Sequence, residues 1–181
     1  MIDLSQSRTV WPLKIKLGRV FWTYGLEPLV RWLPKFCSPL RVGALRLMGA
    51  KIGPACLILP GVEVLMPWNL RLSDHVAIGK DVNIYNFALV SIDRMTVVSQ
   101  GSYLCTGSHD YCDPAMPLVY SPISIGAQCW LAAEVFVAPG VSVAEGVVVA
   151  ARSVVSKPLA DAWWVYGGNP CLPIKKRVMA S

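Results

Sequence analysis

Charge is scarce in this sequence: Asp, Glu, Lys and Arg make up 15% of its 181 residues, and hydrophobic residues make up 54%. A soluble monomer seldom exposes so much apolar surface, so we expect other subunits to cover part of the exterior. A membrane-spanning helix is also missing, because the longest uncharged run, Pro114 to Ala133, contains three prolines and a glycine. The N-terminus lacks the charged start, apolar core and cleavage site of a secretory signal, which predicts a cytoplasmic protein.

Paired cysteines are lacking too. The six cysteines form no C-x-x-C pair and their spacing indicates no disulfide framework, so we expect small buried thiols in a reducing compartment. Residues 1–51 carry nine Lys/Arg against two acids, a net charge of +7, whereas residues 52–181 carry eight against nine, or −1. Because motifs of nucleic-acid-binding domains are absent, this basic segment favours a membrane surface or another anionic partner over nucleic acid.

A repeat of six residues dominates the rest of the chain. Branched aliphatic residues recur at every sixth position from residue 125, and a small residue follows each of them. The aliphatic positions are Ile125, Leu131, Val137, Val143, Val149 and Val155. The same step runs earlier in three series, 52–70, 72–90 and 92–104, separated by two-residue slips. Six matches at both positions exceed what chance gives in a chain with about 30% Ile, Leu and Val.

A period of six fits neither an α-helix nor a simple alternating strand. It fits a short strand followed by a corner, and three such units close one triangular coil with the aliphatic residues inside. Stacked coils then pair their strands in parallel. We therefore predict an all-β solenoid. The alternative, an ordinary β-sandwich, is disfavoured because its strands would not keep one fixed six-residue step.

Departures from the repeat divide the chain into three parts. Residues 1–50 lack the step and predict a basic, amphipathic helical segment, with one helix over Leu13–Trp32 and a second near Pro39–Met48. Residues 51–157 form the solenoid, and residues 105–122 leave it as an extended loop, the kind of segment that commonly carries function. Residues 158–181 form a tail that ends in Lys175-Lys176-Arg177.

These features resemble the hexapeptide-repeat acetyltransferases, namely the galactoside and maltose enzymes and, most closely, the O-acetyltransferases of exopolysaccharide synthesis such as that of colanic acid. The resemblance covers about residues 50–177. Its most specific pieces are Ile84-Tyr85-Asn86-Phe87, Leu104-Cys105-Thr106-Gly107-Ser108-His109-Asp110, Trp130-Leu131-Ala132-Ala133 and Val154-Val155-Ser156-Lys157 followed by Gly168-Asn169-Pro170. It implies a left-handed parallel β-helix, a homotrimer with active sites between subunits, and transfer of acetyl from acetyl-CoA to a sugar hydroxyl.

The resemblance also implies roles for single residues. His109 matches the catalytic general base, and Asn86 matches an asparagine that approaches the acceptor or the histidine across the subunit interface. Expected contacts with acetyl-CoA come from Trp130 beside the thioester, from the backbone of Ala133 and Ala151 along the pantetheine arm, from Ser156 and Lys157 near the adenosine, and from Lys175 at a phosphate. Leu172 replaces a residue that is often basic, so the 3′-phosphate is left to Lys157, Lys175, Lys176 or Arg177.

Other interpretations of these residues stay open. A neutral imidazole suits proton removal from a hydroxyl, and this chemistry requires neither a metal nor a covalent acyl-enzyme. Asp110 could orient the His109 ring or cap a turn, and Trp130 could be plain interface packing. Cys105, His109 and Cys112 lack a fourth zinc ligand and match no common zinc spacing. Nothing indicates an activated Cys105 thiolate. His75 lies within the repeat and is expected to be structural.

Alternative functions also compete. A zinc carbonic anhydrase on this scaffold would need three metal-binding histidines, and the chain has only His75 and His109. A non-catalytic scaffold, or the same fold with a longer acyl donor, remains possible. For the acceptor, the resemblance suggests a sugar or a lipid-linked glycan at the inner membrane face. The N-terminal segment then has two interpretations, as a peripheral membrane contact or as a helix packed on the trimer.

Overall fold

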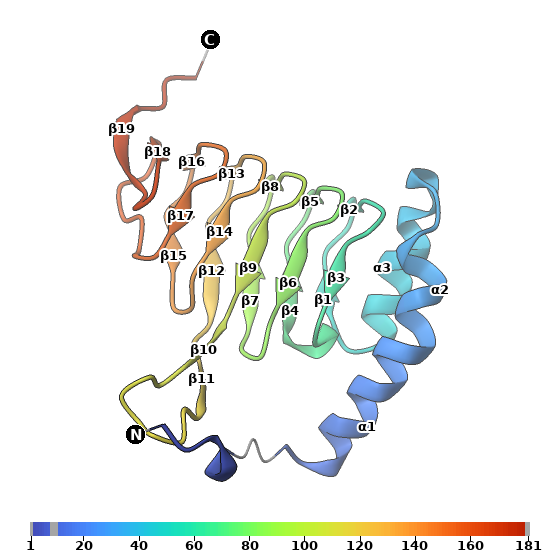
Figure 1. The fold of residues 1–181 in the computed structure, drawn as a ribbon. Helices are drawn as coiled ribbons and strands as arrows, with labels where there is room; N and C mark the ends of the chain where they lie inside the picture. Colours follow the sequence, from blue (N-terminus) through green and yellow to red (C-terminus); the bar gives the residue numbers. More distant parts are fainter. Residues whose placement is uncertain (1, 8–10, 180–181) are drawn as a thin grey trace.

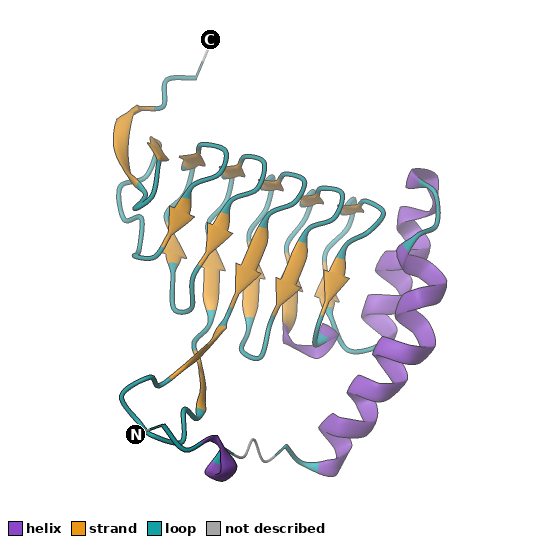
Figure 2. Ribbon diagram, in the orientation of Figure 1, coloured by secondary structure: helices purple, strands orange, loops and turns teal. Residues whose placement is uncertain are grey.

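Short parallel strands wind into a triangular prism, and helices stand at one end of it (Figures 1 and 2). The computed structural model describes residues 2–7 and 11–179. Sheet A consists of β1 (Lys51–Ile52), β4 (Leu70–Leu72), β7 (Val90–Ile92), β12 (Ile123–Ile125) and β15 (Ser142–Val143). Sheet B consists of β2 (Leu57–Ile58), β5 (Ala77–Ile78), β8 (Val97–Val98), β13 (Trp130–Leu131), β16 (Val148–Val149), β18 (Trp164–Gly167) and β19 (Leu172–Lys176). Sheet C consists of β3 (Glu63–Val64), β6 (Asn83–Tyr85), β9 (Tyr103–Cys105), β14 (Phe136–Val137) and β17 (Val154–Val155).

The pairing register shows how the six-residue step becomes a coil. Each coil passes through sheets A, B and C in turn, and Ile125 pairs with Val143, which lies three steps later in the sequence. In the first coils the repeat is two residues longer, since Ile52 pairs with Leu72. The extra residues fall in β4, where both Leu70 and Leu72 are buried. The two-residue slips are therefore part of the coil geometry.

The predicted aliphatic series forms the core. All six positions from Ile125 to Val155 are buried, as are Ile58, Ile78 and their equivalents in the first coils. Gly126 shows why a small residue follows each one, because a Cβ there would lie 2.8 Å from the backbone nitrogen of Glu145 in the next coil. The parallel solenoid is thus confirmed and the β-sandwich alternative was wrong. His75 lies at an exposed corner, outside the core.

Helices cover the first coil. α1 (Leu13–Phe21), the π-helical turn η2 (Trp22–Leu26) and α2 (Glu27–Arg31) follow one another directly, and η3 (Lys35–Cys37) leads into α3 (Ser38–Leu47). The buried Trp22 indole donates to the Val64 carbonyl at 2.6 Å. In α3, the Arg41 guanidinium donates to the Ile58 carbonyl at 2.8 Å and the Ser38 hydroxyl accepts from the Ile58 nitrogen at 2.9 Å. These bonds satisfy the backbone nitrogen and carbonyl of Ile58 in β2, which the end of the sheet would otherwise leave without partners.

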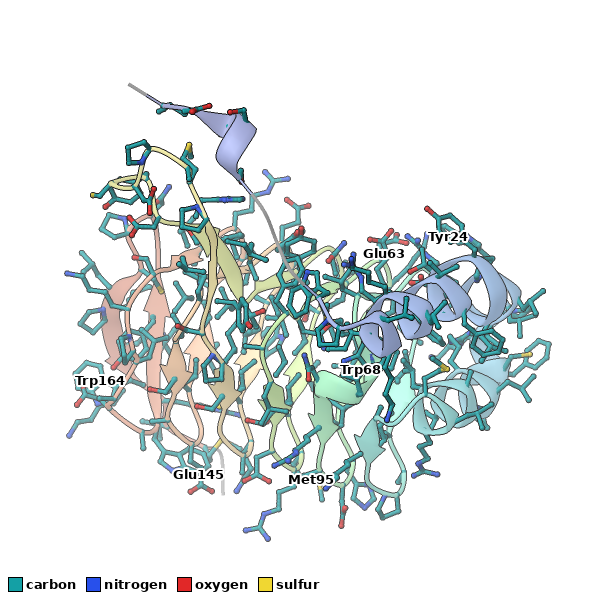
Figure 3. The ribbon with its side chains drawn as sticks, turned by 90° about the horizontal axis from the view of Figure 1, so that it is seen from below. Tyr24, Glu63, Trp68, Met95, Glu145 and Trp164 are labelled. Atoms are coloured by element: carbon teal, nitrogen blue, oxygen red, sulfur yellow. The ribbon has the colours of Figure 1, made fainter. Side chains whose placement is uncertain are left out.

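The packing of α1 against the side of the solenoid centres on one aromatic residue. Trp68 lies in η4 (Pro67–Asn69), at the corner between β3 and β4, and Figure 3 shows it beneath the helical segment. The position of the Gly18 Cα leaves room for that ring, since a Cβ there would come within 3.3 Å of it. Across residues 2–7 and 11–179, none of the helices is both long and apolar enough to cross a bilayer.

The candidate active site

The predicted loop is a hairpin that projects from one corner of the prism. After β9, the chain continues into β10 (Gly107–His109), turns, and returns as the antiparallel β11 (Leu118–Tyr120) before entering β12. The corner from which the hairpin projects joins sheet C to sheet A. His109 pairs with Leu118 and Gly107 pairs with Tyr120, so these four side-chain positions share one face of the hairpin. Ser108 and Val119 occupy the opposite face.

The His109 ring is exposed and held by the turn of its own hairpin. Its Nδ1 lies 2.6 Å from the Met116 carbonyl oxygen. Because a carbonyl oxygen can only accept, Nδ1 carries the hydrogen and the lone pair of the neutral ring is on Nε2. Asp110 lies in the same turn, where its Oδ1 accepts from the Cys112 nitrogen at 3.0 Å. The Met116 carbonyl orients the imidazole, and no sequence pattern predicts this contact because any residue type can supply a carbonyl.

Buried polar groups fix the base of the hairpin. The Thr106 hydroxyl is completely buried, donates to the Tyr85 carbonyl and accepts from the Ala88 nitrogen, both at 3.1 Å. At Gly107 a side chain has no room, because a Cβ would lie 2.7 Å from the Phe87 ring. The strand that carries His109 is therefore located by its neighbours in the preceding coil.

The N-terminal segment also reaches the hairpin. Trp11 stacks on Phe87 and on Tyr120, with ring centroids 5.9 Å apart in both pairs. Beyond it, the Asp3 nitrogen donates to the Pro114 carbonyl at 2.9 Å. No sequence pattern points to a role for Trp11. The only signal was an isolated aromatic residue before the first helix, and nothing in the sequence indicates that it lies on a hairpin about a hundred residues later.

Asn86 does not project toward His109 in the single chain. It is completely buried, its Oδ1 accepts from the Met66 nitrogen at 2.9 Å, and its Nδ2 donates to the Met66 carbonyl at 2.8 Å and to the Asn69 carbonyl at 3.1 Å. Each of these groups belongs to the backbone of the preceding coil. The side chain therefore joins two coils at the corner from which the hairpin projects.

The residues expected at the pantetheine arm lie along a different corner, the one that joins sheets B and C. Ala133 follows β13 and Ala151 follows β16, so they occupy equivalent places in successive coils. Trp130 points outward from β13 and donates to the Ser99 hydroxyl at 2.9 Å. The exposed Arg152 pairs with Glu134 at 2.7 Å on the same corner, and this hydrogen bond raises the pKa of the guanidinium. One elongated ligand could contact all of this edge.

The residues expected near the adenosine and phosphates are at the C-terminal end of the prism. Ser156 and Lys157 are exposed just after β17, and Lys175 is exposed on β19 opposite Val165 of β18. Arg177 is engaged elsewhere: its Nη1 donates to the Gln128 and Gly146 carbonyls at 2.7 and 2.9 Å, and its guanidinium covers the Trp163 ring. Arg177, one of the four candidate phosphate ligands, therefore holds the tail on the solenoid.

Within one chain, His109 and the expected donor edge are kept apart. His109 projects from the corner between sheets C and A, and Ala133 and Ala151 lie at the corner between sheets B and C, so sheet C separates them. The cysteines add no catalytic pair: the Cys105 thiol lies 3.2 Å from the Gly107 carbonyl oxygen. In the described part of the chain, no three His, Cys, Asp or Glu side chains gather as a metal site would require.

Comparison with known proteins gives this arrangement a family. Over 157 residues the chain is 47% identical to the protein named "Putative colanic acid biosynthesis acetyltransferase WcaF" in Escherichia coli (strain K12), covering 87% of this chain and 86% of that protein. A maltose O-acetyltransferase from Clostridium difficile 630 has the same fold, with a TM-score of 0.84, 21% identity, and coverage of 93% and 90% of the two chains. No family model matches the sequence.

A second solved structure concerns the donor. The hexapeptide-repeat acetyltransferase VCA0836 from Vibrio cholerae O1 biovar eltor, complexed with acetyl-CoA, has a TM-score of 0.84 at 21% identity, with coverage of 97% and 96% of the two chains. The solenoid is thus the left-handed β-helix that the resemblance implied. On its six-residue repeat, its fold and its 47% identity to a named acetyltransferase, this chain belongs to the hexapeptide-repeat acetyltransferase family.

Proposed function

We propose that the enzyme transfers acetyl from acetyl-CoA to a hydroxyl of a sugar and that His109 is the general base. The observation that carries this proposal is the contact between His109 Nδ1 and the Met116 carbonyl. It fixes the tautomer of the neutral ring, so that Nε2 is the proton acceptor and points away from the turn. A positioned imidazole of this kind typically contributes about 10²–10⁴-fold to the rate.

The reaction balances without any further reagent. As the sugar oxygen attacks the thioester carbon, its proton passes to Nε2 and a C–O bond forms, which gives a tetrahedral oxyanion. The C–S bond then breaks and the thiolate of CoA leaves. The imidazolium returns its proton to that thiolate, which regenerates the base. The products are the acetyl ester and CoA.

A homotrimer would complete the site. If the C–A corner of one copy meets the B–C corner of the next around a threefold axis, His109 of one subunit faces Trp130, Ala133 and Ala151 of its neighbour. Sheet C then faces the axis, and its outward side chains support this because Tyr103 and Phe136 stack there with centroids 5.8 Å apart. Large aromatic residues of this kind are typical of the buried centre of an interface.

The remaining predicted residues take their places in this scheme. The adenosine and phosphate end of acetyl-CoA would bind to Ser156, Lys157 and Lys175. We favour Lys175 for a phosphate because its side chain is exposed on β19. We propose Asn86 as a positioning residue rather than an acceptor ligand, because both ends of its amide are bonded to backbone. Asp110 positions the turn that presents the Met116 carbonyl.

For the acceptor we propose a sugar of an exopolysaccharide or of a lipid-linked glycan precursor. The support is the name of the 47% identical relative, which places that protein in colanic acid biosynthesis. Such an acceptor would be met at the inner face of the membrane by a cytoplasmic enzyme, and the N-terminal helical segment would make the peripheral contact.

The test compares variants on the same hairpin. CoA release from acetyl-CoA is followed with a thiol reagent across a panel of sugar acceptors, for the wild type, His109→Asn and the control Ser108→Ala on the opposite face of β10. We expect His109→Asn to lose about 10²-fold or more and Ser108→Ala to keep its activity. A wild type that is inactive with every acceptor and that binds no acetyl-CoA would favour the scaffold alternative. Faster transfer from an acyl carrier substrate would favour the longer-donor alternative.

A further inference from the structure

The helical end of the prism exposes an apolar surface that has no function in acetyl transfer. In α3, Val42 and Leu45 pack on the solenoid, but Leu40 and Leu47 on the opposite side are exposed. A helix that is apolar on two sides is normally covered on both. This second side of α3 is therefore not explained by the packing of the single chain.

The preceding elements extend the same surface. Leu29 in α2, Trp32 just after it and Phe36 in η3 are all exposed, and Phe36 keeps 82% of its surface open to solvent. With Leu40 and Leu47 they make up what we call the cap face. α2 and α3 stand at the end of the solenoid opposite the C-terminal tail (Figure 1). Contiguous apolar surface of this kind on a soluble chain marks an interaction site.

The exposed charged side chains of α1 and α3, and Lys51 beside them, are all cations. Lys35, Arg46 and Lys51 are exposed on or beside α3, and Lys14 and Lys16 are exposed on α1. Glu27 is the only acid between residues 11 and 51. It is partly buried beside Arg31, and burial raises the pKa of its carboxyl. Apart from Glu27 and Glu63, which lie beside Arg31, the charged groups of the helical segment that frame the exposed aromatic and aliphatic residues are therefore cations.

We propose that the cap face docks on an anionic lipid surface, with the prism axis upright on the membrane. Aromatic and aliphatic side chains surrounded by Lys and Arg are the composition of interfacial membrane-binding helices. The position supports the same conclusion, because the cap face is at the end of the prism. In an assembly of parallel prisms, every copy presents this face in one direction, and simultaneous contacts multiply the affinity.

This inference deepens the proposed function, because a lipid-linked acceptor would be presented at such a surface. Within the N-terminal segment, it assigns the contact chiefly to α2, η3 and α3. The binding itself needs neither donor nor acceptor, so it can be measured when no acetyl transfer takes place.

The experiment is sedimentation of the full chain with vesicles of phosphatidylcholine alone and of phosphatidylcholine mixed with phosphatidylglycerol. The test variant is Phe36→Ser with Leu47→Ser, two of the most exposed positions of the cap face. The matched control is Val178→Ser, which is 89% exposed in the C-terminal tail. Size-exclusion chromatography and circular dichroism establish that all three proteins keep the same fold and assembly.

We expect the wild type and Val178→Ser to sediment with the vesicles that contain phosphatidylglycerol but not with those of phosphatidylcholine alone. Both proteins should dissociate from the anionic vesicles at high salt. The double variant should bind at least about tenfold more weakly, because each chain of an assembly loses two apolar anchors. Equal binding of the double variant, or no binding of the wild type, would overturn the proposal. So would a concentration-dependent doubling of mass that the double variant abolishes, because the cap face would then join two copies. A CoA-release assay with a soluble sugar should be unaffected by the double substitution, which separates this proposal from the acetyltransferase assignment.

Discussion

The substitution Asn86→Ala tests whether this side chain holds the solenoid together or contacts the acceptor. It removes three hydrogen bonds and leaves the buried Met66 nitrogen and the half-buried Asn69 carbonyl without their Asn86 partner, whereas the Met66 carbonyl keeps a bond from the Asn69 nitrogen at 2.9 Å. Each group left unpaired costs about 1–3 kcal/mol, so the free energy of unfolding should fall by about 2–5 kcal/mol. For a chain of this size each kcal/mol lowers the unfolding midpoint by about 2–4 °C, so the midpoint should fall by about 5–15 °C.

Thermal unfolding followed by circular dichroism measures this loss, and the CoA-release assay below the unfolding transition measures activity in the same samples. Asn83→Ala is the control, since Asn83 lies on the same stretch of chain but is only half-buried and its amide bonds to the Glu63 side chain. We expect its midpoint to change by no more than about 3 °C. An Asn86→Ala protein with an unchanged midpoint and a greatly reduced kcat would refute the positioning role and return Asn86 to the acceptor site.

Four further predictions follow from the hairpin, the tail and the core. Gly107→Ala should lower both stability and kcat, because its Cβ would lie 2.7 Å from a buried Phe87 ring; unchanged kinetics would show that the hairpin tolerates displacement. Trp11→Ala should lower kcat and leave KM for acetyl-CoA unchanged, since Trp11 stacks on Tyr120 beside the base; Trp11→Phe should restore most of the activity. Lys175→Ala should raise KM for acetyl-CoA, whereas Arg177→Ala should mainly lower the unfolding midpoint, because Arg177 is bonded to two carbonyls of the solenoid; the opposite pattern would exchange their roles. Burial raises the pKa of the Cys129 thiol from 9.0 to about 11, so the stability it contributes should be present below pH 9 and decline between pH 9 and about 11, as a comparison of Cys129→Ala with the wild type in denaturant titrations at several pH values can check.

The sequence predicted the solenoid well because its signal is periodic. Each coil repeats the same requirement for an inward aliphatic residue and a small neighbour, so Ile125 and its successors report one geometry six times. The two-residue slips were visible for the same reason. The loop that forms the hairpin was also predicted, because the six-residue repeat stops there.

The site was predicted less completely, because contacts between distant parts of the chain leave no periodic signal. His109 stood out as a rare residue in a distinctive motif, but the Met116 carbonyl that orients it is backbone and has no sequence signature. The Asn86 side chain could face either the solvent or the preceding coil, and only the register, which places Met66 beside it, decides between them. Arg177 looked like a phosphate ligand because the sequence cannot show that two carbonyls already accept its protons.

Both ends of the prism carry elements that cover strand groups of the terminal coils, and this affects how the protein can aggregate. A parallel solenoid is a cross-β stack, and an open terminal coil would be a template on which another molecule could add its own strands and so build a fibre. Here α3 occupies the strand groups of Ile58 at one end, and the antiparallel β19 lies along β18 at the other. These elements restrict the addition of strands end to end and favour assembly through the corners and faces of the prism. Removal of residues 1–47 or of the tail after Gly167 would be expected to release that restriction and produce filaments that bind amyloid dyes.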